Sequence, residues 1–198
     1  MEKCLTSRQK QSIATRNQII QCATVLFTQM SYEKVTISDI CKKANISVGA
    51  FYHHFKSKES ILNEAYRLFD EELQEDWSRI KPGSTHEAIR FLIRKQLEAI
   101  GQNGPIYSTQ FFKNQLTNEV KYILNKERFF YQTLLKNVQQ AVENNEFHGQ
   151  AAEVTDAILR LSRGTIYDWC LHEGHYDLIH QGLKDLDMVI AFYGYRRN

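Results

Sequence analysis

Apolar residues recur along the chain at helical spacing, and only two prolines interrupt its 198 residues. Between residues 19 and 30 they fall on one face of a helix, at Ile19, Ala23, Leu26, Phe27 and Met30. No run alternates with period two for long enough to predict a strand. We therefore expect an all-α fold. The pattern predicts about nine helices, at residues 19–30, 36–44, 48–55, 58–80, 85–101, 106–117, 119–144, 151–172 and 177–195.

Residues that cap helices cluster in the N-terminal third of the chain. Thr36 is followed three positions later by Asp39, which predicts a capping box. Asn45 tolerates the left-handed conformation at the end of a helix, and Ser47 and Ser57 can cap the next two helices. Two short helices joined by a three-residue turn, with a longer helix packed across them, form a helix-turn-helix.

The net charge of +2 is unevenly distributed along the chain. Residues 1–60 carry nine basic and four acidic side chains, net +5, and the remainder carries 16 basic and 19 acidic ones, net −3. The total excludes a uniformly basic, histone-like protein, whereas the local excess puts positive charge where a helix-turn-helix meets a polyanion. We expect a helix-turn-helix domain at 1–60 and a larger helical domain at 61–198.

A specific order of features runs from about residue 15 to residue 62: a capped helix, a turn, an aromatic pair and Lys-x-Lys. Its positions are Thr15, Arg16, Ile19, Ile20, Ala23, Leu26, Phe27, Tyr32, Val35, Thr36, Ile37, Asp39, Ile40, Ala44, Ser47, Gly49, Phe51, Tyr52, Phe55, Lys56, Ser57, Lys58 and Glu59. This pattern closely resembles the N-terminal module of the tetracycline-repressor (TetR) family. Ser31 and Asn45 depart from it, because the family usually has glycine at both positions. The remaining two thirds of the chain resemble the family only in length and helicity.

The resemblance implies a regulator that binds double-stranded DNA. In a helix-turn-helix the second helix, here 48–55, enters the major groove. By resemblance, Tyr52 and Lys58 contact phosphates, and Thr36 at the start of its helix grips another. The candidate DNA-binding residues are Thr36, Ser47, Val48, Gly49, Ala50, Tyr52, His53, His54, Lys56 and Lys58.

The helix at 48–55 has no Arg, Asn or Gln to read G or A with two hydrogen bonds. Val48 and Ala50 offer methyl groups that suit the thymine methyl. We expect these contacts, His53 and the shape of the DNA to share the specificity. The alternative is that Tyr52, His53 and His54 are ordinary surface residues of a helical bundle.

The resemblance also implies a C-terminal domain that binds a small-molecule effector and forms a homodimer. Such a protein is most often a repressor that binds a palindromic operator and is released by its effector. The last two helices are the expected dimer interface, through Ile158, Leu161, Gly164, Thr165, Leu183, Leu186, Val189 and Ile190. The alternative is that these side chains are buried within one chain.

Aromatic residues of the larger domain exceed what packing needs, which predicts a largely apolar pocket with a few polar groups. The candidate ligand-binding residues are Trp77, Phe91, Arg94, Tyr107, Phe111, Tyr122, Phe129, Trp169 and His172. The same aromatic residues are also compatible with a simple hydrophobic core. The sequence does not distinguish a drug-like cation, a lipid or a metabolite.

Other classes of function find little support. There is no GxSxG, GxxxxGK[ST] or GxGxxG, so we expect no enzyme and no catalytic residues. His172, His175, Asp177 and His180 lack the HExxH spacing and a second cluster, so we expect neither a metal site nor a cofactor. A helical adaptor that uses the N-terminal module for protein contacts remains the alternative function.

No secretory signal and no long apolar run is visible, which predicts a soluble cytoplasmic protein without a membrane partner. The four cysteines, among them Cys4, show no CxxC spacing, and Cys22 and Cys41 are expected to be small buried residues. A thiol-sensing role is the minor alternative.

Overall fold

The computed structural model describes residues 6–30 and 32–194, and within these ranges it is all-α, as predicted. Cys4, Ser31 and the expected helix end at 195 lie outside the described residues. The only extended pairing in the described ranges is an isolated bridge between Phe147 and Gly194. The elements are α1 (Ser7–Gln29), α2 (Ile37–Ala44), α3 (Val48–His54), α4 (Lys58–Arg79), α5 (Thr85–Thr117), a 3-10 turn (Tyr122–Leu124), α6 (Phe129–Glu143), α7 (Ala151–Leu171) and α8 (Leu178–Tyr193).

The helix-turn-helix forms as its capping residues predict. Thr36 Oγ1 accepts from the Asp39 backbone N–H at 3.2 Å, and Asp39 Oδ2 accepts from the Thr36 N–H at 2.9 Å. Asn45 ends α2 in the left-handed region, with φ of 50°. Ser47 Oγ then accepts from the Ala50 N–H at 3.1 Å and starts α3. Each cap satisfies a backbone group that a short helix leaves free.

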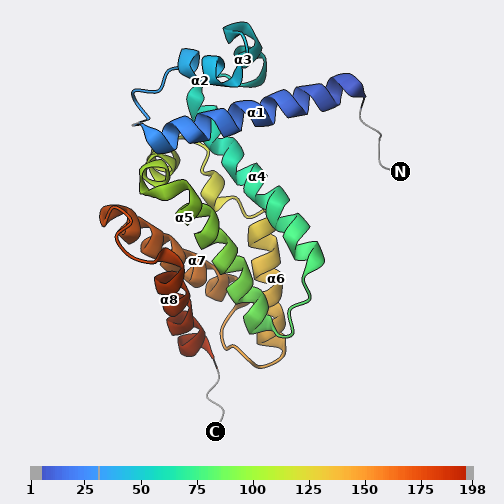
Figure 1. The fold of residues 1–198 in the computed structure, drawn as a ribbon. Helices are drawn as coiled ribbons and strands as arrows, with labels where there is room; N and C mark the ends of the chain where they lie inside the picture. The colour runs from blue at the N-terminus through green and yellow to red at the C-terminus, as the bar shows by residue number, and fades with distance from the viewer. Residues whose placement is uncertain (1–5, 31, 195–198) are drawn as a thin grey trace.

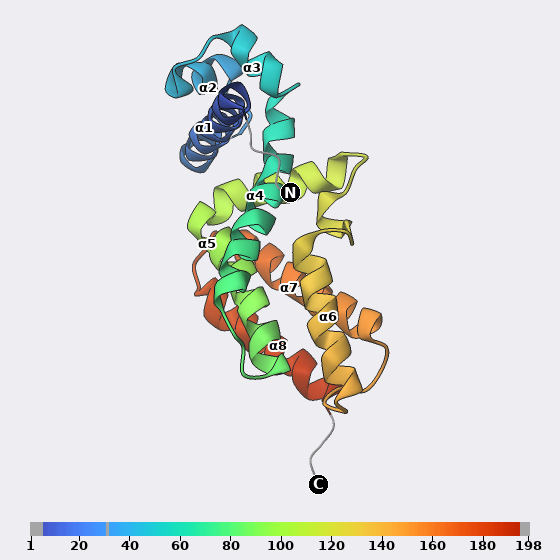
Figure 2. The same ribbon diagram turned by 90° about the vertical axis from the view of Figure 1, so that its right-hand side faces the viewer.

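The helices form two groups, which α4 connects (Figure 1). One group, α1 to α3, lies at one end of the molecule, and α5 to α8 form the larger body below it (Figure 2). Each group has its own hydrophobic cluster. The cluster of the smaller group extends past residue 60 to Ile61, Leu62 and Tyr66 of α4, and it includes Tyr107 and Phe111 of α5.

A kink in α5 explains why residues 6–30 and 32–194 form eight α-helices where nine helices were expected. The predicted break falls inside α5, where Gly104 adopts φ 76° and ψ 170° and Pro105 follows it. Glycine accepts this conformation and proline donates no backbone hydrogen bond, so the helix changes direction here. The segment after the kink carries Tyr107 and Phe111 into the hydrophobic cluster of the smaller group.

α6 begins ten residues later than expected. Arg128, its N-cap residue, donates from Nε and Nη2 to the two carboxylate oxygens of Asp70 on α4, at 2.8 and 2.9 Å. Asp70 also accepts from the Phe130 backbone N–H at 3.4 Å. The start of α6 is therefore fixed by a residue 58 positions away, which helical spacing alone does not reveal.

None of the helices in the described ranges is apolar over a stretch long enough to cross a membrane.

Candidate nucleic-acid interface and ligand cavity

One side of α3 faces solvent at the end of the molecule farthest from the end of α8 (Figures 1 and 2). Phe51 and Phe55 are buried beneath the helix, which turns Val48 and Tyr52 outward, 47% and 55% exposed. Of the ten residues predicted to bind DNA, the exposed ones are Thr36, Ser47, Val48, Gly49, Tyr52, His53 and Lys56, and the half-buried ones are Ala50, His54 and Lys58.

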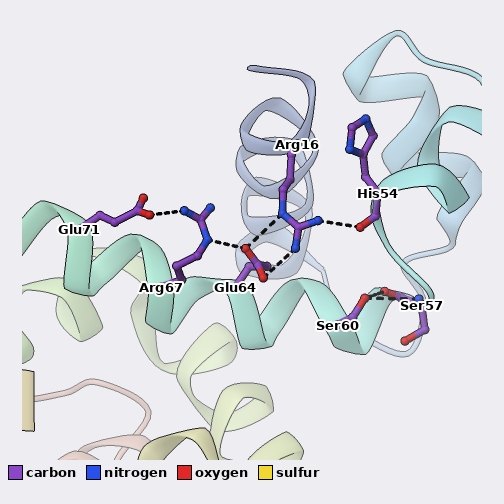
Figure 3. A network of polar contacts seen from close by, with 7 residues as sticks. All are labelled: Arg16, His54, Ser57, Ser60, Glu64, Arg67 and Glu71. Carbon is purple, nitrogen blue, oxygen red and sulfur yellow. Dashed lines mark hydrogen bonds and ion pairs between the residues drawn. The ribbon is translucent and has the colours of Figure 1, made fainter. Parts of the chain in front are cut away.

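Arg16 joins three helices beneath this surface (Figure 3). Its Nη1 donates to the backbone oxygen of His54 at the end of α3, at 2.8 Å, and its Nη2 lies 2.8 Å from Glu64 Oε1 on α4. The guanidinium also lies 4.5 Å from the centre of the Phe55 ring. Arg67 donates to the same Glu64 carboxylate at 2.7 Å and to Glu71. Arg16 therefore orients α3 relative to α1 and α4.

Two titratable groups of this network, Glu64 and His54, have lowered pKa values. Burial on its own would raise the pKa of Glu64, but hydrogen bonds from Arg16 and Arg67 outweigh burial and hold this pKa below its ordinary value. Burial lowers the pKa of His54, and the nearby His53 and Arg16 add to the effect. The imidazole of His54 is therefore neutral near pH 7 in the free protein.

Lys58 holds the loop before α2. Its Nζ donates to the backbone oxygens of Tyr32 and Val35, at 2.7 and 2.9 Å, and lies 4.2 Å from the centre of the Tyr32 ring. Two of the three ammonium protons are thus used within the chain. In the free protein Lys58 therefore has a structural role. The sequence analysis predicted only a phosphate contact for this residue.

A cavity of about 100 Å³ lies in the larger body, between α4, α5, α6 and α7. Of the nine residues predicted to bind a ligand, Tyr107 and Phe111 line it. Most of the lining is apolar, as predicted, and its polar groups include Arg128 and Arg163. The full lining is Ala65, Tyr66, Phe69, Gln96, Ala99, Ile100, Asn103, Tyr107, Phe111, Phe112, Ile123, Asn125, Arg128, Phe130, Tyr131, Leu159, Arg163 and Ile166.

The other seven predicted ligand residues lie outside this lining. Trp77 and Phe91 pack against each other, with ring centres 6.0 Å apart, and Trp169 is buried with its indole N–H donating to the Tyr176 backbone oxygen. Tyr122 stacks on the lining residue Tyr66, with ring centres 6.2 Å apart. The remaining three are Arg94 and His172, which are exposed, and Phe129, which packs against the core. Aromatic content predicted a cavity but could not separate its walls from the core.

Half of the eight predicted dimer-interface residues are buried within the chain itself. Ile158, Thr165, Leu183 and Leu186 are buried, Leu161, Val189 and Ile190 are half-buried, and Gly164 is exposed. Four further apolar side chains of α7 and α8 are exposed: Tyr167, Leu171, Met188 and Phe192. The sequence reasoning missed these four, although their helical spacing of four residues on each helix was available as a signal.

Two of the four residues that could suggest a metal site, His172 and Asp177, lie at helix ends. His172 caps α7, and Asp177 starts α8 by accepting from the His180 backbone N–H at 2.9 Å. In the described part of the chain, no three potential metal ligands converge. Cys41 is buried, as expected, whereas Cys22 is half-buried.

Comparison with known proteins identifies relatives over most of the chain. The model of "Bacterial regulatory proteins, tetR family" matches residues 19–65. The probable acrEF/envCD operon repressor of Escherichia coli K12 is 22% identical, over 92% of this chain and 88% of its own length. The fatty acid metabolism regulator protein of Bacillus subtilis is 26% identical, over 88% of this chain and 93% of its own length.

Among solved structures, FadR from Bacillus subtilis in complex with stearoyl-CoA is similar, with a TM-score of 0.67 and 18% identity. The match covers 88% of this chain and 97% of that one. At this level of identity it shows the same fold.

Proposed function

Because the chain belongs to the tetR family of bacterial regulatory proteins, we propose that it is a ligand-responsive transcriptional repressor. It binds a palindromic operator as a homodimer in the cytoplasm and leaves the operator when a small molecule occupies the cavity. The observation that carries the proposal is α3, whose exposed N-terminal end follows a capped turn on a segment with net charge +5. We divide the molecule into a DNA-binding domain at 1–60 and an effector-binding and dimerisation domain at 61–198.

In this proposal α3 lies in the major groove. Val48 and Gly49 approach base edges, and Tyr52 and Lys56 reach phosphates on either side. Lys58 contributes positive charge and holds the loop before α2, where the N-terminus of that helix faces another phosphate. The absence of arginine from α3 favours reading by methyl contacts and DNA shape.

Three residues shared by the cavity and the smaller group of helices support a route from effector to DNA. Tyr66, Tyr107 and Phe111 line the cavity and also belong to the hydrophobic cluster around α1. Tyr107 also shares a hydrogen bond with Thr24 of α1. A ligand that moves these side chains would tilt α1 to α3 and change the spacing of the two recognition helices of a dimer.

The dimer is proposed to form through the outer faces of α7 and α8. Gly164 and Met188 line one shallow groove between these helices, so the exposed side chains of both belong to the same surface. Tyr167, Leu171 and Phe192 extend it. A second copy of the chain would cover this apolar surface in a four-helix arrangement.

The test is selection of a duplex from a random DNA library, followed by titration of the selected sequence against salt. We expect a palindromic sequence, with a logarithm of affinity that falls linearly with the logarithm of salt concentration. Lys56→Ala is expected to reduce that slope by about one. Failure to enrich any sequence, or binding that is independent of salt, would favour the adaptor instead.

A further inference from the structure

The cavity lining combines a large apolar wall with two guanidinium groups and no carboxylate. One of the two, Arg128, is neutralised by Asp70, which binds it through both oxygens. Both partners are largely shielded from water, with side chains 11% and 15% exposed. This pair adds no net charge to the cavity.

Arg163 of α7 is different. Its Nη2 donates to the backbone oxygen of Ile123 at 3.1 Å, but its Nε is buried and has no hydrogen-bond partner. Within the described ranges no carboxylate forms an ion pair with it, and the nearby Asp156 is engaged by Lys126 at 3.2 Å. Burial lowers the pKa of this guanidinium, yet arginine stays protonated. The cavity therefore carries one uncompensated positive charge.

A second buried donor lies in the same wall. The hydroxyl of Tyr66 is buried and has no hydrogen-bond partner, while its ring packs against Phe111 and lies 4.6 Å from the Arg128 guanidinium. A buried polar group without a partner is destabilising, so two of them in one cavity wall favour a ligand that accepts hydrogen bonds from both. An oxyanion accepts from both an arginine N–H and a tyrosine O–H.

We infer that the cavity selects an amphipathic anion, with an apolar body against the aromatic wall and a carboxylate or phosphate group at Arg163 and Tyr66. This inference rests on the proposed function, because it assigns the chemistry of the effector. It favours an anion over the drug-like cation that the sequence left open, because the lining has two guanidinium groups and no carboxylate to pair with a cation. The cavity volume is of the order that holds a small ring or a short chain, which sets the size of the probes.

The experiment measures binding of four octyl compounds to the full-length protein by calorimetry: octanoate, octyl phosphate, octanol and octylammonium. We expect octanoate or octyl phosphate to bind at least tenfold more tightly than octanol and octylammonium. The tighter of the two anions identifies the head group. Equal binding of octanol or octylammonium, or no binding of either anion, overturns the inference.

Three variants assign the selectivity to its residues. Arg163→Met keeps the bulk of the side chain and should abolish the preference for the anion while leaving octanol affinity within about twofold. Arg163→Lys, which keeps the charge, should retain most of the preference, and Tyr66→Phe should weaken the anion alone by several-fold. An unchanged preference in Arg163→Met overturns the inference. These measurements contain no DNA, so their failure leaves the DNA titration of the proposed function standing, and the reverse also holds.

Discussion

At the scale of the residue, the proposed DNA surface separates side chains that meet DNA from side chains that hold the surface in place. Tyr52 and Lys56 are exposed and project from the end of the molecule, whereas Arg16 and Lys58 are committed to backbone oxygens of neighbouring segments. Removing a residue of the first kind should change affinity, and removing one of the second kind should also change stability.

Tyr52→Phe tests the first kind. The hydroxyl is proposed to bind a phosphate, so its loss should weaken binding of every duplex by roughly tenfold, which corresponds to about 1.4 kcal/mol. The salt dependence should stay unchanged because no charge is removed. Fluorescence anisotropy at several salt concentrations measures both quantities. Tyr122→Phe, at another partly exposed tyrosine far from α3, is the matched control. Equal effects of the two variants would remove Tyr52 from the interface.

Glu64→Gln tests the second kind. A carboxyl whose pKa is lowered by folding stabilises the protein above its unfolded-state pKa of about 4.3, and this contribution is lost as the pH falls through the folded-state pKa. We expect the variant to be less stable than the parent by about 1 kcal/mol at pH 7, with the difference shrinking below pH 4. Urea unfolding at several pH values measures the difference in the free energy of unfolding between the variant and the parent. A difference that does not change with pH would show that the ion pair with Arg16 contributes nothing.

At the scale of the element, close packing between α5 and α8 depends on one glycine. A Cβ atom at Gly182 would lie 2.5 Å from Leu97 Cδ1, and Leu97 is fully buried, so its side chain has little room to move. Gly182→Ala should therefore destabilise the protein by about 1–3 kcal/mol. Gly101→Ala on α5 has no neighbour within 4 Å and should be neutral or stabilising through helix propensity. Chemical denaturation compares the two, and equal stabilities would mean that α8 shifts freely on α5.

The same scale shows what the sequence could predict. The local sequence was sufficient to predict α2 and α3, because Thr36, Asn45 and Ser47 form hydrogen bonds with backbone groups at most four residues away. It was insufficient for the start of α6, which depends on Asp70 in another helix. The residues that line the cavity could not be predicted either. Aromatic residues recur with the same helical spacing whether they face a packed core or a cavity.

At the scale of the whole molecule, the smaller group of helices and the cavity share a wall. The kink at Gly104 carries Tyr107 and Phe111 out of the larger body and into the cluster around α1, while Tyr66 joins it from α4. The excess of positive charge ends near residue 60, but the hydrophobic cluster of the smaller group contains residues on both sides of this position. This continuity is what a ligand-controlled DNA-binding protein needs, since movement of a cavity wall is transmitted without passing through a flexible linker.

The last prediction concerns the dimer proposed to form through the outer faces of α7 and α8. Phe192 is 70% exposed on α8, one turn after Met188, and an exposed apolar stripe of this kind is unfavourable in a monomer. Phe192→Glu would bring two carboxylates into a symmetric interface, so we expect monomers at micromolar concentration in analytical ultracentrifugation and unchanged helicity. Binding to a palindromic duplex should weaken by at least 100-fold, because each monomer then holds only one half-site.

Leu116→Glu provides the matched control for this change. Leu116 is 78% exposed at the end of α5, away from α7 and α8, so the same substitution should leave both the dimer and the DNA affinity intact. If Phe192→Glu remains dimeric, the two recognition helices must be paired through another surface, and α7 and α8 do not set their separation. If the parent protein sediments as a monomer, the tilt of α1 to α3 would have to control DNA binding within a single chain.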